Sequence, residues 1–121
     1  MLTGAPSLSH AATGSVRIII TRLGFVAGNG SGTLHFQGKR YPLRVSGVGA
    51  GPLGAARVDL MGWAYNMRTA GSIHGDYSTV AADGAAAVIR LRNFHGVVLQ
   101  LRGRQGVKPS VDLNGMAISL R

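Results

Sequence analysis

Apolar and polar residues alternate along most of this chain, and that period of two restricts the possible folds more than any other feature. A β-strand turns successive side chains to opposite faces, so the alternation predicts strands with one buried face. Segment 30–48, GSGTLHFQGKRYPLRVSGV, shows the pattern on both sides of a two-residue turn predicted at 38–39. Leu34 and Phe36 fall on its apolar face, and Pro42 indicates an edge or a bulge.

The same alternation predicts further short strands, and turn residues separate them at regular intervals. These strands are expected at 16–23, 56–68, 73–80, 87–93, 97–103 and 115–121. Glycine-rich loops are expected at 27–32 and 49–56, and Gly62 is expected to mark a bend or bulge. The alanines of 81–88 make it the one segment where a helical turn is expected.

Seven to nine short strands with almost no helix predict an all-β fold, either a small antiparallel β-barrel or a β-sandwich. The barrel is the preferred interpretation, because closure removes exposed edges and the many in-strand glycines suit a strongly curved sheet. With only 6% aromatic residues, the interior should be filled by aliphatic side chains and hold no large ligand cavity. In the clearest hairpin, 87–103, Ile89 and Leu91 should face Leu99 and Leu101.

The 121 residues suffice for one domain, which we assign to 16–121. Residues 1–15 are interpreted as a disordered tail or as the remnant of an export signal. LTGA has the form of a lipoprotein cleavage box with Ala5 in place of the lipidated cysteine, and residues 9–11 have the small-x-small pattern of a signal cleavage site. No apolar stretch approaches the roughly eighteen residues that span a bilayer, so no transmembrane segment is predicted.

The charge balance is strongly basic. Thirteen Lys and Arg residues stand against four acids, all Asp, which gives a formal net charge of +9. Such a surface attracts polyanions, namely an anionic lipid surface, lipopolysaccharide, an acidic protein or nucleic acid. The competing interpretation is that these side chains only keep a glycine-rich domain in solution, since they are spread along the chain.

The arginines of the hairpin over 88–104 form the best candidate site. Alternation places them together on the face opposite the apolar one, where like charges would repel unless an anion relieved them. Guanidinium groups suit phosphate and carboxylate because they donate forked hydrogen bonds. The predicted anion-binding residues are Arg90, Arg92, Arg102 and Arg104.

Catalytic and metal-binding signatures are weak. The chain has no cysteine, which excludes disulfides and thiolate chemistry. GNGSG lacks the context of a phosphate loop, because a strand is expected after it where the motif requires a helix. His74 and Asp76 have the spacing that puts both on one strand face, so a hydrolase or a metal site built on them is the remaining catalytic hypothesis. A polar, solvent-facing pair is the ordinary interpretation, and we predict neither enzyme activity nor a cofactor.

Nucleic-acid binding is the main alternative. Single-strand binders of the β-barrel type combine basic residues with exposed aromatic side chains on which bases stack. Only Trp63, Tyr65 and Tyr77 are left as stacking platforms once Phe36 and Tyr41 are assigned to the core and Phe94 to a turn. The charge suffices for non-specific binding, but the stacking residues are few.

Four phrases, GSGTLHFQGKRYPLRVSG, GWAYNMR, GDYSTV and RNFHGVVLQLRG, followed by a glycine before a last apolar strand, occur in an order and spacing that resembles a family. It is the envelope-integrity (EipA-like) family of small exported bacterial proteins and lipoproteins, and the resemblance covers about residues 30–120. It implies a β-barrel in the periplasm or attached to the outer membrane, with no established catalytic residue. This chain differs from the family in lacking an intact signal and a lipidated cysteine.

Overall fold

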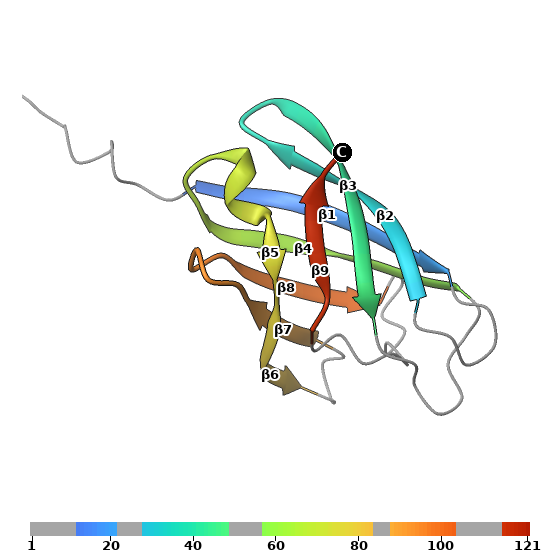
Figure 1. Ribbon diagram of the computed structural model, residues 1–121. Helices are drawn as coiled ribbons and strands as arrows, with labels where there is room; N and C mark the ends of the chain where they lie inside the picture. The colour runs from blue at the N-terminus through green and yellow to red at the C-terminus, as the bar shows by residue number, and fades with distance from the viewer. Residues whose placement is uncertain (1–11, 22–27, 49–56, 84–87, 104–114) are drawn as a thin grey trace, which may run out of the picture.

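The computed structural model describes residues 12–21, 28–48, 57–83, 88–103 and 115–121 and confirms the predicted all-β fold. One nine-stranded antiparallel sheet contains every described strand (Figure 1). The strands are β1 (Ala12–Thr21), β2 (Gly28–Phe36), β3 (Lys39–Val48), β4 (Arg57–Met67), β5 (Gly75–Asp76), β6 (Ser78–Asp83), β7 (Val88–Arg92), β8 (Val98–Gly103) and β9 (Ala117–Leu120). The short 3-10 helix η2 (Ala70–Ile73) lies between β4 and β5.

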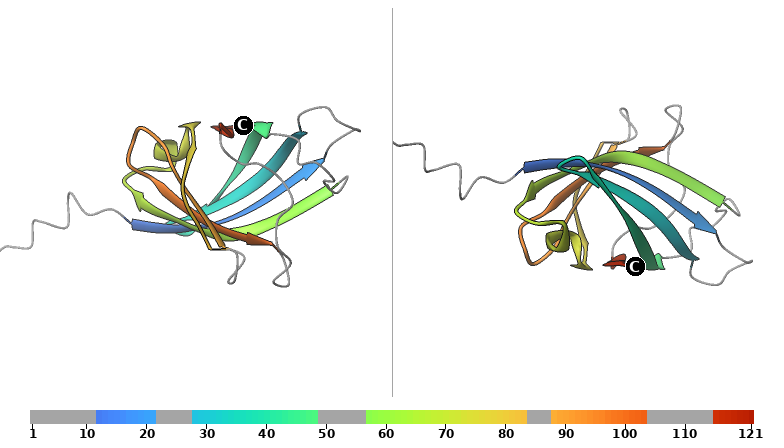
Figure 2. Two further views of the ribbon diagram at one scale, coloured as in Figure 1. Left: turned by 90° about the horizontal axis from the view of Figure 1, so that it is seen from below. Right: turned by 90° about the horizontal axis from the view of Figure 1, so that it is seen from above.

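The sheet curls into a nearly closed barrel, and its two edge strands, β5 and β6, follow one another directly in the chain. The strand order is β5-β9-β3-β2-β1-β4-β8-β7-β6, and only Tyr77 separates β5 from β6. The Tyr77 amide donates to Met116 O at 2.8 Å, and Gly115 N donates to Tyr77 O at 2.8 Å. One continuous segment therefore pairs with β9 at its start and with β7 at its end, and Figure 2 shows β9 lying across the interior from β4.

Inward-facing side chains of almost every strand form one core cluster. As predicted, aliphatic residues dominate it, with Phe36 and Tyr77 as its buried aromatic members. The hairpin of β7 and β8 pairs Ile89 with Leu101 and Leu91 with Leu99, as expected. At the end of β9, Leu120 stands opposite the buried Leu43 and is 37% exposed.

The predicted loop at 27–32 is wrong, because β2 begins at Gly28. A Cβ at Gly32 would lie 2.5 Å from Arg17 O, and one at Gly30 would lie 3.0 Å from the Cα of Ile20. These glycines let β2 approach β1 closely, which a strongly curved sheet requires. Neither Gly30 nor Gly32 has a positive φ angle, so these glycines serve close strand packing.

Gly62 also has a different role from the one expected. β4 keeps an unbroken register with β1 and β8 through this residue, so the described sheet has no bulge at this point. A Cβ at Gly62 would overlap the carbonyl of Gln100 and would lie 3.1 Å from the Cα of Leu101. The missing side chain allows β8 to pack against β4.

The hairpin turn between β2 and β3 lies one residue earlier than predicted. It consists of Gln37 and Gly38, with φ angles of 51° and 80°, the two positive angles of a type I′ turn. Lys39 pairs with Phe36 and belongs to β3. Pro42 is in an interior strand, not at an edge, but it lies beyond the last residue pair of β3 and β9, where its missing N–H breaks no ladder.

Two further expectations differ in position. β1 begins at Ala12, four residues before the expected strand, because pairing with Met67 on β4 extends it. Residues 81–83 of the segment expected to hold a helical turn belong to β6, and 84–87 lie outside the described residues. The only described helix is η2, and its four residues are far too few to cross a membrane.

Candidate anion-binding face

The structure describes nine Lys and Arg side chains, and all nine are exposed on the outside of the barrel. The single ion pair among the described residues joins Arg17 to Asp59, with Nη2 2.9 Å from Oδ2. The other eight have no carboxylate partner in the described part of the chain: Lys39, Arg40, Arg44, Arg68, Arg90, Arg92, Arg102 and Arg121. The described part of the outer surface therefore carries an excess of positive charge.

The structure brings three of the four predicted site residues together. Arg90 and Arg92 point outward from β7, and Arg102 points outward from the neighbouring β8. We call these three residues the arginine face. The fourth predicted residue, Arg104, lies outside the described residues.

The register of β7 and β8 moderates the expected repulsion. Arg90 stands opposite Gln100, to which its Nε donates at 3.0 Å, and Arg102 stands opposite Val88. No arginine of this face is directly opposite another. Arg90 is the diagonal neighbour of Arg102, with Cβ atoms about 7 Å apart, and Arg92 lies two residues further along β7. Arg90 therefore lies between the other two, and the three guanidinium groups share one face without being forced into contact.

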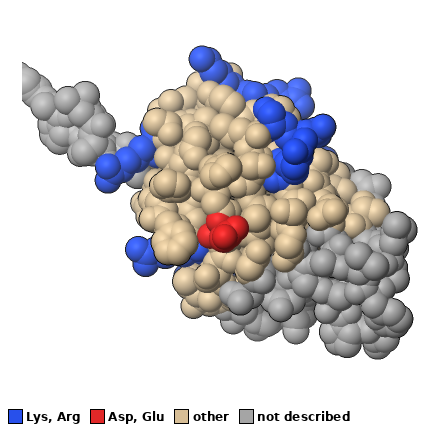
Figure 3. Space-filling view, viewed as in Figure 1, with Lys and Arg blue, Asp and Glu red and all other residues tan. Residues whose placement is uncertain are grey.

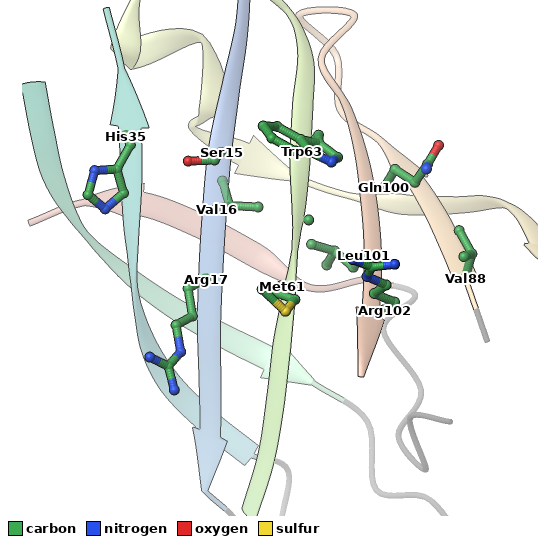
Figure 4. Close-up of a pocket in the computed structure, with 11 residues that line it drawn as sticks. Ser15, Val16, Arg17, His35, Met61, Trp63, Val88, Gln100, Leu101 and Arg102 are labelled. Atoms are coloured by element: carbon green, nitrogen blue, oxygen red, sulfur yellow. The ribbon is translucent and has the colours of Figure 1, made fainter. Parts of the chain in front are cut away.

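A groove of about 320 Å³ adjoins the arginine face. Trp63 and Met61 of β4 lie in it between Arg17 on β1 and Arg102 on β8 (Figure 4). Trp63 is 50% exposed and Met61 is 39% exposed. The groove thus offers an aromatic ring and a thioether to a ligand beside a guanidinium group, with the Gln100 side chain at its edge.

The Arg17 side of the groove is neutralised. Asp59 raises the pKa of Arg17 through two hydrogen bonds, at 2.9 and 3.3 Å, and through its negative charge. Both side chains are at the surface, where an ion pair contributes little to stability. Among the described cations that line the groove, Arg102 therefore remains available to an anion.

A second hollow, of about 410 Å³, lies on the other side of the barrel. Arg44 and Ser46 of β3, Asn29 of β2 and Arg121 line it. Figure 3 shows Lys and Arg side chains gathered in the upper part of the molecule, near the C-terminus and the first part of β3. The hollow lacks an exposed aromatic side chain among its lining residues, which distinguishes it from the groove beside Trp63.

The catalytic hypothesis gains no support from the geometry. His74 and Asp76 are both exposed, and no hydrogen bond or ion pair joins their side chains in the described structure. Within the described ranges, no three His, Cys, Asp or Glu residues are placed to hold a metal ion. His35 and His95 are exposed on separate elements, and His10 lies outside the described residues.

Of the expected stacking platforms, Tyr77 is wrong, because its side chain is fully buried. Its hydroxyl donates to Ile73 O at 2.6 Å and accepts from Asn93 Nδ2 at 3.2 Å. Burial raises the pKa of this phenol above its ordinary range, and the hydrogen bond from Asn93 lowers it by less. Trp63 remains a possible platform, and Tyr65 is half-buried beside it on the same face of β4.

Comparison of this chain with protein-family models, curated proteins and solved structures finds no match.

Proposed function

We propose that this chain is a non-catalytic β-barrel of the bacterial cell envelope that binds an anionic envelope component through its arginine face. The ligand is an anionic lipid or lipopolysaccharide, or else an acidic partner protein. The family resemblance supports the periplasmic or outer-membrane location. The observation that carries the binding function is the set of eight exposed cations without a described carboxylate partner, three of which share the arginine face.

The arginine face is preferred to the second hollow because a groove with an exposed aromatic side chain adjoins it. Arg102 lines a groove that also exposes Trp63, so one ligand can place an anionic group on the guanidinium and an apolar part on the ring. Binding sites usually combine apolar lining with a few placed polar groups, as this groove does. The hollow around Arg44 offers charge but no exposed aromatic ring among its lining residues.

Sedimentation with lipopolysaccharide and with vesicles containing phosphatidylglycerol tests the proposal. We expect the chain to bind both, and binding to weaken as salt screens the charges. The double variant Arg90→Ser/Arg102→Ser should bind about tenfold to thirtyfold more weakly, because each arginine near an anionic surface contributes about 1 kcal/mol.

Arg44→Ser/Arg121→Ser is the matched control, because it removes the same charge from strands on the other side of the barrel. It should lose much less affinity than the first double variant. Equal losses would assign binding to net charge, and a larger loss in the control would move the site to the second hollow. Absence of binding to either anionic material would overturn the proposed function.

Half-exposed Trp63 beside Arg102 is the observation that favours nucleic-acid binding as the second candidate. Bases stacked on the indole would quench its fluorescence. Titration with a single-stranded oligonucleotide separates the two functions. Quenching at lower concentrations than those at which lipopolysaccharide binds would favour nucleic acid over the envelope ligand.

A further inference from the structure

Phe94 is 97% exposed, so its ring contacts almost nothing in its own chain. The next most exposed large apolar side chains of the described residues, Val80 and Trp63, are 56% and 50% exposed. Single apolar residues are common on protein surfaces, but a phenylalanine with this degree of exposure leaves its whole apolar area in water. It stands in the turn between β7 and β8, residues 93–97.

The turn that carries Phe94 is held rigidly from within. The side-chain oxygen of Asn93 accepts hydrogen bonds from the amides of His95 and Val97, both at 3.0 Å. Asn93 N donates to Val97 O at 3.2 Å, and Gly96 N donates to Asn93 O at 3.2 Å. Gly96 has a φ of 81°, which a residue without a side chain adopts easily.

The same turn is fastened to the body of the barrel. Asn93 is buried, and its Nδ2 donates to Ser72 O at 2.8 Å and to His74 O at 3.3 Å. On the other side of the turn, Asn66 Nδ2 donates to Gly96 O at 3.2 Å. Phe94 is therefore presented to solvent by a fixed support, so little conformational entropy remains to be lost when its ring is buried.

Positive charge surrounds this end of the barrel. The turn lies at the end of the barrel where β1, β3 and β8 begin and where β2, β4 and β7 finish. We call this the Phe94 end. Its exposed cations are Lys39, Arg40, Arg68, Arg92 and Arg121, which follows β9 and whose amide donates to Pro42 O. One described carboxylate, Asp76, also belongs here, since Gly75 lies against Asn93. Described cations therefore outnumber the described side-chain carboxylate at the Phe94 end.

We propose that the Phe94 end docks on an anionic phospholipid bilayer, with the Phe94 ring inserted into the interfacial region and the surrounding cations on the headgroups. Apolar side chains next to Lys and Arg are the combination that holds peripheral proteins at anionic membranes. The inference rests on the proposed function, because it takes the anionic envelope component to be lipid. It adds the orientation of the barrel, in which Arg92, the residue shared by the arginine face and the Phe94 end, lies on the headgroups, and a contact that depends on the apolar ring.

A bilayer fits this end better than a pocket in a partner protein. Arg92 ends β7 and Arg68 follows β4, beside the Phe94 turn, whereas Lys39 and Arg40 begin β3, which β2, β1 and β4 separate from β8. Charge distributed over the whole end matches a broad negative surface. A protein pocket for one phenylalanine would instead require its charges close to that pocket.

Phe94→Ser is the central test, in the full chain, with vesicles of phosphatidylglycerol and phosphatidylcholine. The substitution is in an exposed turn and leaves the Asn93 hydrogen bonds in place. We expect affinity for the vesicles to fall about tenfold to a hundredfold, the effect of losing one buried phenylalanine side chain. Val80→Ser, which removes another exposed apolar residue, should leave affinity unchanged.

A fluorescent variant reports insertion directly. Trp63→Phe/Phe94→Trp has a single indole at the turn, and its emission should shift to the blue and become protected from acrylamide when anionic vesicles are added. Vesicles of phosphatidylcholine alone should produce a much smaller shift at the same lipid concentration. A shift of equal size on neutral vesicles would contradict the role of the cations.

Soluble inorganic polyphosphate separates this inference from the proposed function. Phe94→Ser should bind polyphosphate as the wild type does, because no apolar phase is present. If the wild type and Phe94→Ser bind vesicles equally well, the insertion is disproved while the anion-binding function stands. If Phe94→Ser weakens polyphosphate binding as much as vesicle binding, the insertion is likewise disproved. If the wild type binds neither material, the proposed anion-binding function itself is disproved.

Discussion

Asn93 and Tyr77 form the polar centre of a barrel whose interior is otherwise apolar. Asn93 is the only buried polar side chain among the described residues apart from the hydroxyl of Tyr77. Each hydrogen-bonding group of the pair has a partner, which is the condition for burying polar atoms without a large energetic cost. The pair joins the 3-10 helix, the closing segment and the β7–β8 turn at one point.

Tyr77→Phe should make the protein less sensitive to alkaline pH. The unfolded chain releases the phenol proton from about pH 10, whereas burial keeps the folded-state pKa above that value. Above about pH 10 the unfolded state therefore binds fewer protons, and the free energy of unfolding falls as pH rises. The stabilisation is fully present below that pH and is lost above it.

Urea denaturation of the wild type and of Tyr77→Phe between about pH 8 and about pH 11 checks this. At the lower pH the variant should be less stable by about 1–3 kcal/mol, since Ile73 O loses its hydrogen bond. The gap should narrow toward the higher pH, by up to about 1.4 kcal/mol per pH unit. Parallel curves over the whole range would contradict the assigned pKa direction.

Strand pairing in this barrel depends on glycines that remove a steric obstacle. Gly62 of β4 faces the backbone of β8, and Gly30 and Gly32 of β2 face the backbone of β1. At none of these three is a positive φ the reason for glycine. The sheet curves until its two edges meet the one segment that contains β5 and β6. At these three glycines a side chain would overlap the backbone of the neighbouring strand.

Gly62→Ala should destabilise the protein by about 2–3 kcal/mol or more, because the new methyl group would overlap the Gln100 carbonyl and push β8 from β4. Chemical denaturation followed by circular dichroism measures the change. Gly71→Ala in η2 is the matched control, since its Cβ would meet only Thr69 Oγ1 at 3.7 Å. The control should stay within about 0.5 kcal/mol of the wild type. A Gly62→Ala protein as stable as the control would show that β4 and β8 are not so closely packed.

At the scale of the whole molecule, net charge has opposite effects on folding and on binding. A formal charge of +9 on 121 residues repels itself in the compact state, and salt screens that repulsion. The same salt weakens attraction to an anionic ligand. One surface property therefore predicts that added salt stabilises the fold while it releases the ligand.

Raising NaCl from about 10 mM to about 300 mM should increase Tm by a few degrees, because the screening length falls from about 30 Å to below 8 Å. Thermal unfolding without ligand measures this. Arg44→Ser/Arg121→Ser, which lowers the formal charge by two, should show a smaller increase. A Tm that is constant or falls over this range would mean that repulsion among the exposed cations does not limit stability.

The alternation of the sequence was enough to predict an all-β fold, the Ile89–Leu101 hairpin and the outward direction of Arg90, Arg92 and Arg102. These properties are local, because a strand fixes the face of each side chain relative to its neighbours along the chain. The groove could not be predicted in this way. Its lining comes from strands distant in sequence, which only their pairing brings side by side.

Only the tertiary structure decided that Tyr77 is buried and why several glycines are present. Tyr77 closes the barrel and is fully buried, whereas Phe94 is held out in water, although both lie near polar residues in the sequence. The physical reason is that local alternation does not contain the curvature of the sheet. Curvature determines which segment meets both edges, which backbones nearly touch, and which side chain has no neighbour to pack against.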